Sequence, residues 1–234
     1  MKARHILGVA GLAALLAGAA FAQRVLIADP TVTTAETKMT SAEKAVFDRD
    51  AVPGVRAAIS KETCEEAVEV AGVAHGAFSV AAAKQSLVFY QFCQTGNGFG
   101  HVGLVLIENG KVIGNFISEA GWSIGLGVVA DVNRNGTDEF TLHYSGGMHQ
   151  GESGIGVDLF EFVKGTPTGI GWFKTEAIMP DQPAIAWKVT AFPGKTPVFY
   201  HSKYRATGKN GWREIGRASR FPLEKPYSKF TAVK

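Results

Sequence analysis

The sequence predicts a mainly β protein made of antiparallel sheets, with one short helical segment near its N-terminus. From Ser86 onward, short runs of β-branched and aromatic residues recur, and glycine or proline separates them at short spacing. Two of these runs, 101–108 and 111–118, meet at Asn109-Gly110, the pair that best tolerates the positive φ angles of a type I′ turn. No segment of the sequence has the pattern of the long helices that a doubly wound α/β fold needs.

The N-terminal part of the chain contributes little to the predicted sheets. Residues 23–39 are polar, rich in threonine and without hydrophobic period, so we expect a flexible lead-in. Thr40-Ser41-Ala42-Glu43 fits a capping box, which predicts a short helix that Val52-Pro53-Gly54 should end. Residues 58–73 fit either a helix or a strand.

The remaining strands are predicted from apolar runs bounded by turn residues. No obvious linker interrupts the chain after residue 60, so residues 40–234 are expected to form a single β-rich domain. Strands are expected at 87–93, 126–130, 140–145, 157–163, 171–176, 185–191, 198–204 and 212–218.

Residues 1–22 have the pattern of a secretory signal peptide. Lys2 and Arg4 precede an uncharged apolar stretch, and Ala20-Phe21-Ala22 supplies a small-x-small cleavage site. The alternative is an uncleaved anchor, but the stretch is short for a bilayer span and rich in alanine and glycine. We therefore expect a secreted or periplasmic protein with no membrane span after cleavage.

Export would place the two cysteines, Cys64 and Cys93, in an oxidising compartment. Two lone thiols in an oxidising compartment usually pair, so a structural disulfide is predicted. The competing role is a catalytic cysteine, but no activating group stands beside either residue. Two cysteines without a CxxC pair also argue against a four-ligand zinc site.

The charge of the chain is small overall and unevenly placed. The formal net charge of +3 is too low for a dedicated nucleic-acid binder, and it falls to +1 without Lys2 and Arg4. Residues 195–234 hold ten basic and two acidic side chains, whereas residues 23–194 hold 12 basic and 19 acidic ones. The basic region either neutralises the acidic body, which we favour, or binds an anionic partner.

Residues 131–139 carry the clearest chemical signal. Asp131, Asn133 and Asn135 place oxygen-bearing side chains at loop positions 1, 3 and 5, Gly136 permits a sharp turn, and Glu139 supplies an acid at position 9. Hard oxygen ligands at this spacing suit Ca²⁺. An EF-hand needs a glutamate at position 12, where Leu142 stands, so that motif is excluded. The alternative is a polar turn without metal.

Apolar runs flank this loop on both sides, so it joins two strands. The strand–Asp-x-Asn-x-Asn-Gly-x-x-acid–strand unit resembles the FG-GAP repeat of integrin-α-like β-propellers and their secreted bacterial relatives, over about residues 121–163. The resemblance implies propeller-blade-like antiparallel sheets and a Ca²⁺ bound by the side chains of Asp131, Asn133, Asn135 and Glu139 and by the Thr137 carbonyl. Because the motif occurs once, a β-sandwich is the alternative fold.

Two classes of function follow from these patterns. The first is an exported, non-enzymatic binding, adhesion or envelope module with a calcium-stabilised loop, whose ligand is a glycan or a protein. The second is a secreted hydrolase of carbohydrates that uses acids such as Glu119, Glu152 or Asp158. His143 lies on the strand face opposite to the apolar residues, where a surface or packed histidine is ordinary.

Overall fold

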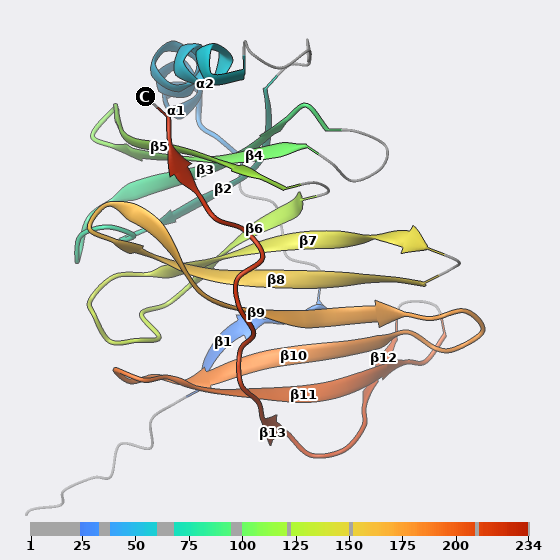
Figure 1. Cartoon of the computed structure of the whole chain (residues 1–234). Coiled ribbons are helices and arrows are strands. Elements are labelled where there is room, and N and C mark those ends of the chain that lie inside the picture. Colours follow the sequence, from blue (N-terminus) through green and yellow to red (C-terminus); the bar gives the residue numbers. More distant parts are fainter. Residues whose placement is uncertain are drawn as a thin grey trace, which may run out of the picture.

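Two antiparallel sheets and a short helical segment make up the fold, as the sequence predicts (Figure 1). The computed structural model describes residues 24–32, 38–59, 68–94, 100–120, 123–149, 152–208 and 211–233. The expected leader, residues 1–22, lies outside these ranges, so its cleavage stays a prediction.

The smaller sheet has five strands in the order β14-β5-β4-β3-β2. At its centre is the predicted hairpin, in which Glu108 pairs with Lys111. Asn109 and Gly110 have φ angles of 50° and 71°, the positive values that this turn requires. The strands are β2 (Glu69–Gly76), β3 (Gln85–Phe92), β4 (His101–Glu108), β5 (Lys111–Glu119) and β14 (Thr231–Ala232).

The larger sheet has nine strands, and its main path runs β12-β11-β10-β9-β8-β7-β6. Strands β6 to β9 run up and down like the strands of a propeller blade, but the sheet continues through β10 to β12. Strand β10 pairs with β9 over only two residues and then with β1, so the sheet curls into a half-barrel. The strands are β1 (Val25–Ala28), β6 (Ser123–Val129), β7 (Glu139–His149), β8 (Glu152–Val163), β9 (Thr166–Ile178), β10 (Ile185–Phe192), β11 (Val198–Ala206), β12 (Trp212–Glu214) and β13 (Ser219–Arg220).

Strand β1 differs from the sequence-based expectation, because it lies within the segment expected to be a flexible lead-in. Ile27 and Ala28 are buried, and Leu26 pairs with Thr190 of β10. Four apolar residues are too few to show a period, and they become a strand because β10 offers an edge that β9 has left. The strand expected at 212–218 is also shorter than expected. It covers only residues 212–214, as β12, and another short strand, β13, follows at residues 219–220.

The helical segment begins as predicted and extends further than predicted. Thr40 caps α1 (Ser41–Val46), and both hydrogen bonds of the capping box with Glu43 are present. The chain then passes through a π-helical turn, η1 (Phe47–Ala51), into α2 (Val52–Ile59). Pro53 lies in the first turn of α2, where its missing N–H is tolerated, so it does not end the helix. Among the described helices none is long and apolar enough to cross a membrane.

Three apolar clusters hold the layers together. The first lies between the two sheets, which pack face to face as in a sandwich, and includes Phe89 and Phe140. The second joins the five-stranded sheet to the helical layer through Tyr90 and Phe47. The third fills one end of the half-barrel and includes Val129 and Phe173. The half-barrel therefore buries both of its faces, one against the other sheet and one inside its own curl.

A C-terminal strap, residues 221–233, crosses both sheets (Figure 1). Glu224 exchanges two backbone hydrogen bonds with Trp172 of the larger sheet, both of 2.9 Å. Further along, β14 pairs with β5 of the smaller sheet. Between these points, the buried Asp158 carboxylate accepts backbone N–H bonds from Tyr227 and Ser228, of 2.7 and 2.8 Å.

Candidate metal site

The loop of interest joins β6 to β7, which pair from Val129 and Glu139 onward. The predicted strand–loop–strand arrangement is therefore confirmed. Val132 and Glu139 are fully buried, whereas Arg134, Asn135 and Gly136 are exposed. The loop is thus anchored in the half-barrel at both ends and open to solvent at its turn.

The loop oxygens converge on the backbone of the turn. Both carboxylate oxygens of Asp131 accept N–H bonds, from Asn135 at 2.8 Å and from Gly136 at 3.0 Å. The same Asn135 N–H is shared with the Asn133 side-chain oxygen, at 3.0 Å. Gly136 has a φ angle of 90°, a conformation that favours glycine. The structure therefore brings the oxygens of positions 1 and 3 around one turn.

Glu161 of β8 orients the two asparagines. Its Oε2 accepts hydrogen bonds from the Nδ2 of Asn133 at 2.8 Å and from the Nδ2 of Asn135 at 3.0 Å. The two amide nitrogens therefore point toward the Glu161 carboxylate, and the two amide oxygens face the loop. The amide oxygen of Asn135 accepts hydrogen bonds from the N–H and the hydroxyl of Thr137. Sequence reasoning missed Glu161, because it lies 26 residues beyond Asn135 and only the pairing of β7 with β8 brings it near.

Glu139 is the unusual member of the set. Its Oε2 accepts the Val132 N–H at 2.7 Å, but its Oε1 is buried without a hydrogen-bond partner among the described residues. Burial raises the pKa of Glu139 to about 7, and the negative charge of Asp131 contributes to the rise. A buried carboxylate oxygen with no partner is costly, and a bound cation would remove this cost.

The type of ligand atom at this loop decides which metals fit the site. All candidate ligands are oxygens, which hard cations such as Ca²⁺ prefer to zinc or copper. No cluster of three or more His, Cys, Asp or Glu that could hold a metal occurs in the described part of the chain. A cation at this loop would therefore depend on amide and carbonyl oxygens in addition to the carboxylates of Asp131 and Glu139.

The loop also contacts the other sheet. Asp138 accepts the Ala77 N–H through Oδ2 at 2.8 Å, and its own N–H donates to the Ala77 carbonyl, also at 2.8 Å. Ala77 begins the connection between β2 and β3. The candidate metal loop is thus part of the junction between the two sheets.

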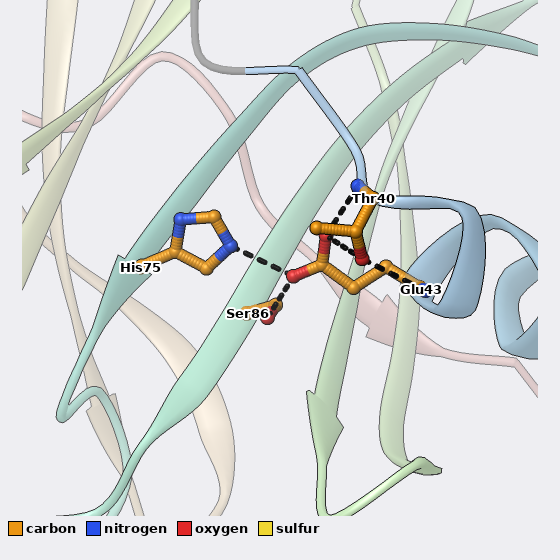
Figure 2. A network of polar contacts seen from close by, with 4 residues as sticks. All are labelled: Thr40, Glu43, His75 and Ser86. Atoms are coloured by element: carbon orange, nitrogen blue, oxygen red, sulfur yellow. Dashed lines mark hydrogen bonds and ion pairs between the residues drawn. The ribbon is translucent and has the colours of Figure 1, made fainter.

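A second polar cluster joins α1 to the smaller sheet (Figure 2). Glu43 Oε1 accepts hydrogen bonds from the Ser86 hydroxyl and from His75 Nε2, the latter at 2.7 Å. Although burial raises it, bonds from Ser86, Thr40 and His75 lower the pKa of Glu43 to about 2. Because Ser86 donates to the carboxylate and not to the imidazole, the cluster fixes the helix and lacks the hydrogen bond that activates a serine nucleophile.

The three acids considered for a hydrolase lie in different environments. The Asp158 carboxylate is occupied by the strap, and Glu119 and Glu152 are exposed at strand ends. Of the two cysteines, Cys93 is buried and Cys64 lies outside the described residues, so their pairing stays a prediction.

Comparisons with known proteins found no matching family model, no matching curated protein and no matching solved structure.

Proposed function

We propose that this chain is an exported, non-enzymatic binding module, for adhesion or for the cell envelope, whose 131–139 loop is stabilised by Ca²⁺. The observation that carries the proposal is the buried Glu139 Oε1, which has no partner within the described residues and lies near the Asp131 carboxylate. A buried carboxylate with one unpartnered oxygen beside a second acid is the environment that a divalent cation neutralises.

In the proposed site, Asp131, Asn133, Asn135 and Glu139 bind Ca²⁺ through side chains, and Thr137 binds through its carbonyl. Glu161 is a positioning residue, because it holds both asparagine amides by their nitrogens. With two carboxylates among the ligands, we expect a weak site, with a Kd of about 10⁻⁴–10⁻³ M, in the range of extracellular modules. The FG-GAP-like spacing and the expected export agree with this range.

The test is the melting temperature of the protein as a function of Ca²⁺. At 10 mM Ca²⁺, a Kd in this range stabilises the fold by roughly 1.4–2.7 kcal/mol, which raises the Tm by about 3–10 °C. Glu139→Gln should abolish this rise, because it removes the carboxylate while its amide oxygen can still accept the Val132 N–H.

Asp181→Asn is the matched control, since it removes a carboxylate from an exposed turn far from the loop in sequence. This variant should keep the full response to Ca²⁺. A wild-type Tm that does not move with Ca²⁺, or a full response in Glu139→Gln, would disprove the calcium site.

A further inference from the structure

The half-barrel is filled at one end and hollow at the other. The hollow end opens into a cavity of about 950 Å³, a size that accommodates a small organic ligand. Strand β2 of the smaller sheet and the segment around Met39 complete its wall. The cavity is partly open to solvent, because Val32, Lys38 and Val128 of its wall are exposed. It is distinct from the 131–139 loop, none of whose residues lines it.

The change in side-chain size along β6 explains the hollow. Val129 belongs to the apolar cluster, but the next positions on the same face are Gly127 and Gly125, both of which line the cavity. A Cβ at Gly127 would lie 2.5 Å from the Thr141 hydroxyl, so glycine is needed there. A Cβ at Gly125 would meet no atom within 4 Å, so this glycine faces empty space.

The wall is mainly apolar. It carries two polar side chains, His143 and Glu176, that have one hydrogen bond and none, respectively, within the described residues. Met39, Leu126 and Ile155 supply apolar surface. His143 has one hydrogen bond in the described structure, between Nε2 and the Thr141 hydroxyl at 3.1 Å. Loss of hydration lowers the pKa of His143 to about 4, which favours the neutral ring. The Glu176 carboxyl is partly buried, and none of the described residues bonds to it; burial raises its pKa.

The charged groups near the mouth are for the most part neutralised within the chain. Asp29 pairs with Lys188 at 2.8 Å, and His75 bonds to Glu43 at 2.7 Å. Lys44 pairs with Asp48, and Lys38 is exposed, so solvent screens its charge. Glu176 is then the one partly buried acid on the wall without a partner in the described residues.

We infer that this cavity binds a small amphiphile with an apolar body and a single amine, whose ammonium pairs with the Glu176 carboxylate while the body contacts Met39, Leu126 and Ile155. An apolar pocket with few placed polar groups is the usual form of a small-molecule site. The inference rests on the proposed binding role and names its ligand, but it does not depend on calcium.

Three probes with the same alkyl chain separate the contributions. Decylamine and decanoate are titrated into the full chain below their micelle concentrations and 1-decanol below its solubility limit, with binding followed by calorimetry. We expect decylamine to bind at least tenfold more tightly than decanoate. Glu176→Gln should weaken decylamine about tenfold and leave 1-decanol unchanged.

A cavity-filling variant tests the location. Gly125→Phe places a ring in the empty space and should weaken both decylamine and 1-decanol at least tenfold, with an unchanged Tm; Gly125→Leu serves if the phenylalanine variant does not fold. Gly194→Phe is the matched control, because Gly194 also has open space around it and does not line the cavity. It should bind like the wild type.

The inference is overturned if decanoate binds more tightly than decylamine, or if Gly125→Phe binds as well as Gly194→Phe. All titrations are run in EGTA and again in 10 mM Ca²⁺. Amine binding in EGTA with no calcium-dependent Tm shift would reject only the metal site, and the reverse pattern would reject only the cavity ligand.

Discussion

At the scale of single residues, β7 is unusual because its side chains from Glu139 to Ser145 are buried or partly buried on both faces of the strand. Phe140, Leu142 and Tyr144 alternate with Glu139 and His143, and a half-buried strand with this pattern usually turns its polar face to water. Here the sheet curls, so the polar face also lies inside the fold. Because of this curl, Glu139 is buried and His143 is partly buried. The curl depends on pairing between strands that are distant in sequence.

His143 is partly buried, and the resulting loss of hydration of its ring predicts a pH dependence of stability. The pKa is about 4 in the folded state and near 6.5 in the unfolded chain, so the unfolded state binds more protons between these values. The contribution is fully present above pH 6.5 and is lost as the pH falls to 4, by up to about 3 kcal/mol. Urea unfolding in EGTA at pH 4–7 should show a smaller loss for His143→Gln than for the wild type. Equal slopes would contradict the burial of this ring.

At the scale of elements, local chemistry predicted the hairpin and the helix start, and long-range pairing decided the rest. Asn109-Gly110 and the Thr40 capping box act within a few residues, so the sequence alone identifies them. Strand β1 and the role of Glu161 depend on partners far along the chain, so no local signal marks them. The loop ligand set was predicted from spacing, whereas the unpartnered oxygen of Glu139 required the fold.

Gly110 provides a clean test of the hairpin. Its φ angle is 71° and a Cβ there would touch nothing, so Gly110→Ala changes only the backbone preference. We expect a loss of about 1 kcal/mol in the free energy of unfolding. Gly194→Ala, where no positive φ and no close neighbour occur, should be neutral or slightly stabilising in the same urea titration. A similar effect of both substitutions would mean that the turn is not in this conformation.

At the scale of the whole molecule, the strap and the 131–139 loop both connect the two sheets. Asp158 is central to the first connection, because its carboxylate accepts two strap N–H groups inside the protein. Asp138 makes the second connection through Ala77. The two connections lie on different elements, so each can be weakened separately.

Asp158→Asn should release part of the strap. The amide keeps one acceptor and loses the charge, and a hydrogen bond to a charged group contributes about 1.5–3 kcal/mol, so a loss of this size is expected in unfolding. Hydrogen exchange should show faster exchange at the Tyr227 and Ser228 amides. The same variant should leave the Asn109-Gly110 hairpin protected, and uniform loss of protection over the molecule would contradict a local role.

The strap also has a consequence for the order in which the molecule is completed during synthesis. The strands of each sheet are mostly neighbours in sequence, so hairpins can form as soon as their residues leave the ribosome. Residues 224–232, which join the sheets, are made after all of the other strands. Until this segment has left the ribosome, the two sheets lack the strap that joins them, and the edge of β5 is unpaired and open to association with other chains.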